Sequence, residues 1–398
     1  MRFLQKPLYS FEELLELEPN EKLNEILFTL DHIQITNNTR NRRGPKGYSR
    51  FAFCRAFLAM KICSIPTVVS LRERLLSDLK FKYTCGFDLN RPVPSEATFS
   101  RVFSLITIND TLEKIFADCI EKARELGIID SEIIAIDATN IKAYETKQPK
   151  KDIDQDGTKA DWGAKRNSNG NQLTWFGYKL HIAVDAKSEC PVAIELTPAS
   201  TSDGDMAIPL IEKDYRNRKD RPKARYFVMD SGYDQSKNYQ TVQEEYSGQA
   251  IIPLNPRNEK QPPAGYDFNG TPICSAGYNM VYWGDNKFRC PHILGKVDCP
   301  FGSNWCSSSD YGMVVKTKIK DDPRRFCNPH RDTKGWKEIY NKRTAVERTF
   351  GRLKEHFGLN NFKVQGFKKV YAHILLSCIA LVAANIAIHH RTCKREVA

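Results

Sequence analysis

Acidic residues are fewer than basic residues in this chain, and they are scarcest near its C-terminus. The 398 residues include 60 Lys and Arg against 48 Asp and Glu, which gives a formal net charge of +12. Between positions 340 and 398, 11 Lys and Arg face only three Asp and Glu. This balance favours an anionic partner, and nucleic acid is the first to consider, although a merely basic surface gives the same count.

Signals for export are also missing. The start, MRFLQKPLYSFEELLELEP, has no continuous apolar stretch and turns acidic by residue 12, so we expect no secretory signal and a cytoplasmic location. Residues 371–390 are apolar enough to resemble a membrane span, but His373, Ser377 and Asn385 interrupt them. We therefore expect a buried helix there and no membrane partner.

Paired CxxC motifs are absent, although the chain has 12 cysteines. Without an export signal, reduced thiols or metal ligands are favoured over disulfides. One stretch gathers possible zinc ligands: Cys274, Cys290, His292, Cys299, Cys306 and Cys327. Their spacing departs from that of zinc ribbons, yet thiolates and imidazole suit Zn²⁺ and a small insertion has little core of its own. A structural zinc site and free, partly buried thiols both remain open.

No internal repeat is visible, and the apolar pattern divides the chain into three regions. Residues 1–128 place apolar residues at three- and four-residue spacing, which predicts an all-α domain. Its basic stretch NTRNRRGPKG suits DNA phosphates, although such a domain can also serve only for packing. Residues 129–255 and 337–398 mix apolar strands and helices, which predicts an α/β domain with a mixed sheet. Residues 256–336 are rich in Pro, Gly, Cys and Trp and predict a small insertion.

Inside the α/β region, two apolar runs end in an acid. EIIAID ends at Asp137, and RYFVMD ends at Asp230. Ligands gather beyond strand ends in open α/β sheets, although a single strand-end Asp is more often a turn residue. Other acids with weaker claims to a metal are Asp185, Asp203, Asp205 and Asp234. His181 and Trp175, on or beside a predicted hairpin, are expected to be structural, although the histidine could be catalytic and the tryptophan could stack on a DNA base. Residues 147–172 are expected to form a polar loop or a partly ordered arm.

A third acid stands among cations in YNKRTAVERTFGRLK, residues 340–354. This segment predicts one helix, and at about 100° per residue Tyr340, Arg343, Glu347 and Lys354 share one arc. An apolar stripe lies beside that arc: Val346, Phe350, Leu353 and Phe357. The composition suits phosphate chemistry, because an acid can bind a metal while cations and a phenol hold phosphate oxygens.

Asp137, Asp230 and Glu347 together indicate a site for hard cations. No Cys or His accompanies them, and carboxylate oxygens are the ligands that Mg²⁺ or Mn²⁺ prefers. Two such ions could bridge one phosphate, one activating the attacking oxygen and the other stabilising the leaving oxygen. A metal ligand beside groups that position DNA accounts for the acid among the cations.

These residues carry a resemblance to a known family. The spacing Y-x2-R-x3-E-x6-K, from Tyr340 to Lys354, resembles the signature of bacterial insertion-sequence DDE transposases. MDSGYD (229–234) is similar to the element around that family's second Asp, and AIDATNIKA (135–143) to the element around the first. The stretch from YSRFAFCRAF to SEATFSRVF resembles the helical domain that precedes the catalytic domain, and the whole resemblance covers about residues 45–390.

The resemblance implies a ribonuclease H-like catalytic domain, in which Asp137, Asp230 and Glu347 bind two Mg²⁺ or Mn²⁺ ions. Tyr340, Arg343 and Lys354 are then contacts to double-stranded DNA at the transposon ends. The implied reaction is cleavage at those ends, followed by attack of the freed 3′-OH on target DNA. A homodimer or higher oligomer on DNA is expected, at the bacterial nucleoid.

Two other functions stay open at this stage. One is a DNA-binding descendant of a transposase that has no strand-transfer activity, although an intact acidic triad argues against it. The other is a stand-alone metal-dependent DNA nuclease, which would not require paired specific ends.

Overall fold

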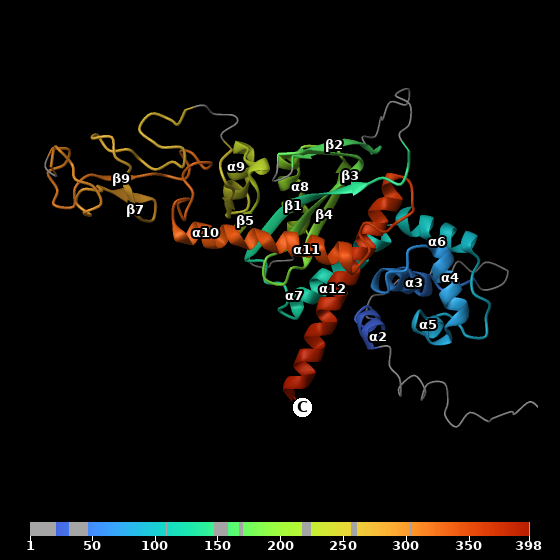
Figure 1. Cartoon of the computed structure of the whole chain (residues 1–398). Coiled ribbons are helices and arrows are strands. Elements are labelled where there is room, and N and C mark those ends of the chain that lie inside the picture. The colour runs from blue at the N-terminus through green and yellow to red at the C-terminus, as the bar shows by residue number, and fades with distance from the viewer. Residues whose placement is uncertain are drawn as a thin grey trace, which may run out of the picture. The chain divides into compact units, whose positions relative to one another are not determined.

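A computed structural model describes residues 21–31, 47–108, 110–146, 158–166, 170–216, 224–255, 261–302 and 305–397 (Figure 1). The chain forms two compact units. The first comprises Met1–Ile129, Ile141–Tyr178 and Phe350–Ala398. The second comprises Asp130–Asn140 and Lys179–Thr349. These units are defined by compactness, so the division by role into 1–128, 129–255 with 337–398, and 256–336 stays a prediction.

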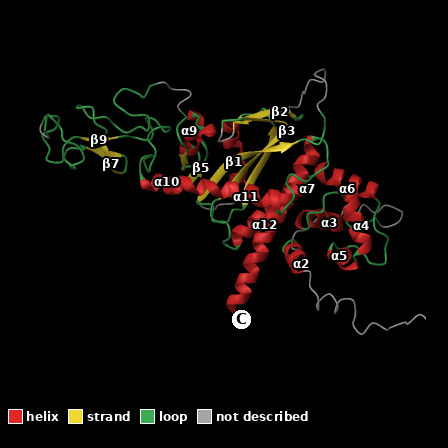
Figure 2. Ribbon diagram, in the orientation of Figure 1, coloured by secondary structure: helices red, strands yellow, loops and turns green. Residues whose placement is uncertain are grey.

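Every element in the described part of Met1–Ile129 is a helix (Figure 2). These helices are α2 (Glu21–Phe28), α3 (Arg50–Ile62), α4 (Val68–Ser77), α5 (Leu79–Thr84), α6 (Glu96–Ile108) and α7 (Thr111–Glu125). Side chains cap three of them: Thr67 accepts a hydrogen bond from the Ser70 N–H, Asp78 accepts one from the Phe81 N–H, and Ser95 accepts one from the Thr98 N–H. The basic residues of NTRNRRGPKG up to Lys46 lie outside the described residues.

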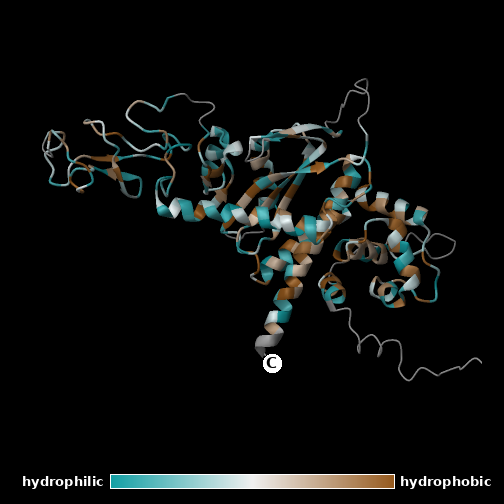
Figure 3. Cartoon of the chain, in the orientation of Figure 1, coloured by the Kyte–Doolittle hydropathy of each residue, from teal (hydrophilic) through white to brown (hydrophobic). Residues whose placement is uncertain are grey.

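The predicted buried helix near the C-terminus is α12 (Phe367–Val397). Within the described residues it is the one helix long and apolar enough to cross a membrane, and 78% of its most apolar window is buried inside the structure. Apolar residues, drawn brown in Figure 3, recur along much of its length. A helix that is apolar on most sides and covered by protein is a core helix, as predicted.

The larger sheet of the chain has parallel strands at its centre. β1 (Ile133–Lys142) pairs with β5 (Tyr226–Val228), and β5 pairs with β6 (Gln249–Ile251), both in parallel. On the other side of β1 lies β3 (Gln172–Asp185), which also pairs with β4 (Pro191–Pro198) across the predicted hairpin turn. The central strands are mostly buried, as expected for apolar strands covered on both faces.

One strand was not expected. β2 (Asp161–Arg166) lies inside the stretch 147–172 that was predicted to be a loop, and it pairs antiparallel with residues 172–177 of β3. The polar side chains of β2 hid the strand pattern in the sequence. The strand is held by its backbone pairing with β3 and by the contact of Trp162 with Phe176, whose ring centroids are 5.8 Å apart. Residues 147–157 and 167–169 lie outside the described part of the chain.

The predicted insertion carries a small antiparallel sheet of β7 (Val281–Gly284), β8 (Lys287–Arg289) and β9 (Val314–Lys316). Asp285 and Asn286 join β7 to β8 with φ values of 48° and 55°, as a tight hairpin of this kind requires. The helical segments of the second unit are η1 (Asp203–Met206), α8 (Ala207–Arg216), η2 (Ser231–Tyr233), α9 (Ser236–Glu244), α10 (Lys334–Tyr340) and η4 (Asn341–Arg343), followed by α11 (Thr344–Glu355).

The single helix predicted over residues 340–354 is therefore wrong. α10 ends at Tyr340, a 3-10 turn covers Asn341–Arg343, and α11 begins at Thr344. A 3-10 turn winds more tightly than an α-helix, so Tyr340 is rotated away from its predicted position on the wheel. The apolar stripe is buried as predicted, since Val346, Phe350, Leu353 and Phe357 are all nearly inaccessible to solvent.

Candidate active site

Asp137 lies inside a strand rather than at its end, because β1 continues to Lys142. The residue is buried. Its Oδ1 accepts a hydrogen bond from the Ala138 N–H at 2.7 Å, and its Oδ2 accepts one from Arg343 Nη1 at 3.3 Å. The strand thus presents a largely buried carboxylate that an arginine partly neutralises.

Asp230 lies two residues beyond β5 and caps the N-terminus of η2. Its Oδ1 accepts the Gly232 N–H at 2.8 Å. A Cβ at position 232 would lie 2.9 Å from that same oxygen, so a larger residue there would shift the Asp230 carboxylate slightly.

Glu347 sits in the first turn of α11, and its side chain is 52% exposed. The start of this helix is anchored to the β3–β4 hairpin, because the buried Thr349 hydroxyl donates to the Glu189 carbonyl at 3.0 Å and Arg348 pairs with the Glu189 carboxylate. Glu347 itself accepts a hydrogen bond from Arg343 Nη2 at 2.7 Å. The helix is held firmly while this acid faces solvent.

Arg343 brings two of the three predicted acids together. One terminal nitrogen of Arg343 contacts Asp137 and the other contacts Glu347. These two acids are 210 positions apart in the sequence. Burial lowers the pKa of the guanidinium, but the charges of Glu347, Tyr340 and Asp137 outweigh it and raise that pKa. Arg343 also lies 6.0 Å from the centre of the Tyr340 ring, which stacks on Trp336 at 5.0 Å.

The pKa values of Tyr340 and Tyr233 are both affected by the third acid, Asp230. Burial raises the pKa of Tyr340, the Arg343 charge lowers it, and the Asp230 and Asp137 charges raise it further. Burial also raises the pKa of Tyr233, and Asp137, Asp203 and Asp230 add to that rise. Asp137 and Asp230 are therefore both near enough to Tyr233 and Tyr340 for their charges to act on these two phenols.

Tyr233 was not predicted to take part in chemistry, yet it borders this site. The side chain is fully buried, and its hydroxyl has no hydrogen-bond partner within the described residues. A buried hydroxyl without a partner is costly, so a water or a bound group beside the carboxylates would satisfy it. The MDSGYD motif was the available signal, but it identified the tyrosine only as part of a turn.

Comparison with protein families decides the identity. A family model described as "Transposase DDE domain" matches residues 129–383, more than half of the chain and all three carboxylates. The chain belongs to the DDE transposase family. A second model, described as "Transposase domain (DUF772)", matches residues 10–105 of this transposase. A search of curated proteins found no match.

Transposases of this family act on DNA and typically use divalent metal ions. Three carboxylates form a donor set that fits Mg²⁺ or Mn²⁺ chemically, and the unsatisfied hydroxyl of Tyr233, on which the charges of Asp137 and Asp230 act, fits a hydrated site. Among the described residues no three His, Cys, Asp or Glu side chains gather closely enough to hold an ion. Here Arg343 lies between Asp137 and Glu347 and supplies the positive charge.

Lys354, the fourth member of the predicted arc, belongs to the other compact unit of the transposase. Its ammonium lies 5.8 Å from the centre of the Phe350 ring. Burial lowers the pKa of Lys354, and the nearby Lys165 lowers it further. The two lysines thus place positive charge near each other, which suits an anion.

The competing acids of the transposase have structural partners. Asp185 accepts the Ser131 N–H at 2.8 Å and the Ser188 hydroxyl at 2.6 Å in the hairpin turn. The remaining rivals form ion pairs: Asp203 with Lys179 at 2.9 Å, Asp205 with Lys237 at 2.6 Å, and Asp234 with Arg324 at 2.7 Å. Each of these acids therefore has a partner that stabilises the local structure.

Two further residues fit their structural interpretation. His181 is buried and its Nε2 lies 2.9 Å from the Thr197 hydroxyl; burial lowers its pKa to about 4, while Asp203 opposes and Lys179 adds to this change. Trp175 is buried, and its indole N–H donates to the Tyr178 carbonyl at 3.1 Å. A buried ring is not available to stack on a DNA base.

The structure does not support the zinc site. The six residues predicted as possible ligands are all described, and they do not gather into a metal-binding group: Cys274, Cys290, His292, Cys299, Cys306 and Cys327. Cys327 instead lies in an apolar cluster with Val228, Ile251 and Trp336, and burial raises its thiol pKa. His292 accepts the Cys299 N–H through Nδ1 at 3.2 Å. The wide, irregular spacing reflects separate free thiols.

Proposed function

We propose that this transposase cleaves DNA at the ends of an insertion sequence and transfers the freed 3′-OH strand to target DNA. One observation carries the proposal. Arg343 joins Asp137 and Glu347 at 3.3 and 2.7 Å, and the charges of Asp137 and Asp230 both act on the adjoining Tyr340. Arg343 and the Tyr340 phenol thus lie beside two of the acids and within reach of the charge of the third, which supports a site of the Y-R-E-K type found in insertion-sequence transposases.

Asp137, Asp230 and Glu347 are the proposed ligands of two Mg²⁺ or Mn²⁺ ions, which when bound supply Lewis acidity to the attacking and leaving oxygens. Arg343 and Tyr340 are proposed to hold phosphate oxygens of the transposon end, through a charged fork and a phenolic hydrogen bond. Lys354 is proposed as a further phosphate contact. Thr349 and Arg348 keep the start of α11 in place while DNA binds.

The reaction has two balanced steps. The oxygen of water attacks phosphorus at the transposon end, the bond from phosphorus to the 3′ oxygen breaks, and a 3′-OH and a 5′-phosphate result. That 3′-OH then attacks a phosphodiester of target DNA, so one ester bond forms as another breaks. Arg343 can balance negative charge that builds up on the phosphoryl oxygens in both steps.

The remaining parts of the chain suit this role. The parallel core of β1, β5 and β6 beside the β3–β4 hairpin supports a ribonuclease H-like fold. We further propose that the all-α N-terminal domain binds DNA and that a homodimer or higher oligomer assembles on paired ends at the bacterial nucleoid in the cytoplasm. The net charge of +12 supports contact with DNA.

The test compares wild type, Glu347→Gln and the control Glu355→Gln, which removes an exposed acid from the end of the same helix. Each protein is incubated with Mg²⁺ or Mn²⁺, DNA carrying the ends that flank its reading frame, and a target plasmid. We expect cleavage and joining by wild type and the control, and loss of both in Glu347→Gln.

Other outcomes point to other functions. Specific binding without cleavage by any protein indicates a DNA-binding descendant. Cleavage that ignores the end sequence and gives no joined product indicates a nuclease. Cleavage unchanged in Glu347→Gln shows that Glu347 is not part of the active site.

A further inference from the structure

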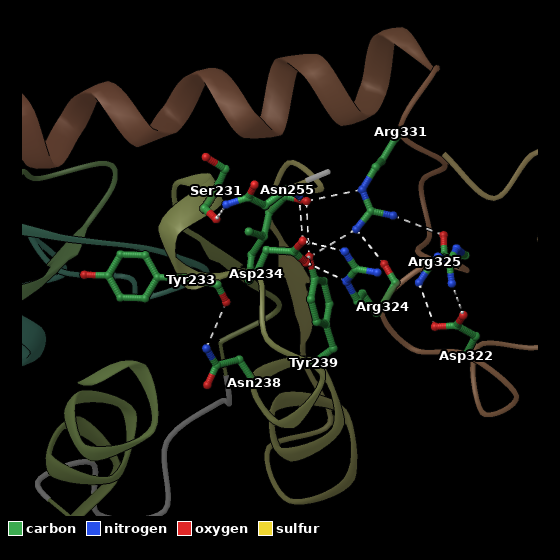
Figure 4. Close-up of polar contacts among 11 residues, drawn as sticks. Ser231, Tyr233, Asp234, Asn238, Tyr239, Asn255, Asp322, Arg324, Arg325 and Arg331 are labelled. Atoms are coloured by element: carbon green, nitrogen blue, oxygen red, sulfur yellow. Dashed lines mark hydrogen bonds and ion pairs between the residues drawn. The ribbon is translucent and has the colours of Figure 1, made fainter. Parts of the chain in front are cut away.

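A second carboxylate, Asp234, stabilises the turn that carries Asp230, and its side chain is only 1% exposed. Arg324 binds both of its oxygens, through Nε at 2.9 Å and Nη2 at 2.7 Å. The Tyr239 hydroxyl donates to Oδ1 at 2.9 Å, and the Asn255 N–H donates to Oδ2 at 2.6 Å (Figure 4). Four donors thus fix this carboxylate on both oxygens.

The backbone of the same turn is also fixed. Asn238 donates its side-chain N–H to the Tyr233 carbonyl at 2.9 Å, and Asn255 donates to the Ser231 carbonyl at 3.3 Å. These carbonyls flank Gly232, whose N–H holds Asp230. In Figure 4 the Tyr233 ring points away from Asp234, so the two residues face opposite sides of the turn.

The arginine comes from the predicted insertion. Arg331, also in that segment and buried, donates to the Arg324 carbonyl at 2.7 Å and to the Ile252 carbonyl at 3.2 Å. It also reaches the Tyr239 hydroxyl at 3.3 Å. Arg331 therefore locks the backbone of Arg324 against the strand end after β6, and Arg324 in turn locks Asp234.

The electrostatics agree with this geometry. Burial raises the pKa of Asp234, but hydrogen bonds from Arg324, Asn255 and Tyr239 outweigh burial and lower that pKa. The carboxylate is therefore ionised near neutral pH and binds Arg324 as a charged pair in a water-poor site, where paired charges hold each other strongly.

We propose that Arg324 is a positioning residue for the active site: through Asp234 it fixes the turn that presents Asp230 to the metal ions. The insertion is thereby part of the catalytic apparatus, and a displacement of the Arg324 loop displaces a metal ligand. This proposal rests on the proposed role of Asp230. Groups that orient metal ligands typically change metal affinity by about 10- to 100-fold when removed.

The test measures Mn²⁺ binding to the full chain by isothermal titration calorimetry, with thermal unfolding of each variant as the check on folding. Arg324→Met removes the pair, and Arg324→Lys keeps the charge but loses the two parallel N–H groups. Lys320→Met is the control, because it removes an exposed cation four residues away in the same segment. We expect Mn²⁺ affinity to fall about 10-fold or more in Arg324→Met, by less in Arg324→Lys, and not in Lys320→Met.

Unchanged Mn²⁺ affinity in folded Arg324→Met, or in folded Arg324→Lys if the first variant does not fold, overturns the proposal and leaves Arg324 a purely structural residue. Asp230→Asn separates this result from failure of the proposed function. If Asp230→Asn also binds Mn²⁺ as wild type does, Asp230 is not a metal ligand. If only Asp230→Asn weakens binding, the active site is correct and the positioning role is wrong.

Discussion

Two arginines of the second compact unit hold carboxylates in opposite ways. Arg324 and Asp234 are 15% and 1% exposed, and other donors complete the coordination of Asp234. Arg343 shares its two ends between Asp137 and Glu347, and the Glu347 side chain is 52% exposed. The first pair is enclosed and bidentate; the second is divided between two acids and reaches solvent.

This difference distinguishes a structural ion pair, Arg324 with Asp234, from the ion pairs of Arg343 in the candidate active site. A buried ion pair that is fully hydrogen-bonded has little reason to exchange partners, because either charge left alone in a water-poor site is strongly destabilising. A half-exposed glutamate held by one guanidinium can exchange that partner for another cation at low cost. Sequence position does not distinguish the two, since Asp234 lies only four residues beyond Asp230.

The largest expected difference is in stability. Arg324→Met leaves the Asp234 charge buried without its ion-pair partner, so we expect the free energy of unfolding to fall by about 3–5 kcal/mol. Glu347→Gln breaks a half-exposed pair and is expected to change it by less than about 1 kcal/mol. Urea unfolding followed by tryptophan fluorescence measures both. An equal loss of unfolding free energy in the two variants would contradict the distinction between a structural ion pair and an exchangeable one.

A second difference appears on acidification. The folded-state pKa of Asp234 is lowered, so its stabilising contribution is present above its unfolded pKa of about 3.9 and is lost as the pH falls through the folded value. We expect the melting temperature of wild type to fall more steeply below about pH 4 than that of Asp234→Asn, which has no proton to take up. Parallel curves for the two proteins would contradict the charged state assigned to this pair.

The smallest expected effect concerns Arg343. If this guanidinium competes with metal ions for Asp137 and Glu347, Arg343→Met should bind Mn²⁺ more tightly without DNA, by about fivefold for a pair worth about 1 kcal/mol. Lys342→Met, which removes an exposed cation of the same 3-10 turn, serves as control. Titration calorimetry measures both variants. Weaker binding by Arg343→Met would mean that the arginine supports the metal site instead.

The elements that carry the candidate site could be predicted because their signals are local. Apolar runs identified the strand that contains Asp137 and the strand that precedes Asp230, and helical spacing identified the stripe beside Glu347. The hydrogen bond from the Gly232 N–H to Asp230 likewise joins residues only two positions apart.

The rest depends on contacts between distant segments. Arg324 and Asp234 are 90 positions apart, and no periodicity relates them. β2 was missed because its stability comes from pairing with β3 rather than from its own polar sequence. The cysteines of residues 256–336 are the opposite case, because they lie close together in the sequence but do not gather into a metal site among the described residues.

The most direct test of the central claim is anomalous diffraction from crystals of the full chain soaked in Mn²⁺. The account predicts anomalous peaks in contact with carboxylate oxygens of Asp137, Asp230 and Glu347, with Arg343 displaced from between two of them. Peaks at Asp203 or Asp205 instead, with Arg343 still bound to Asp137 and Glu347, would contradict it.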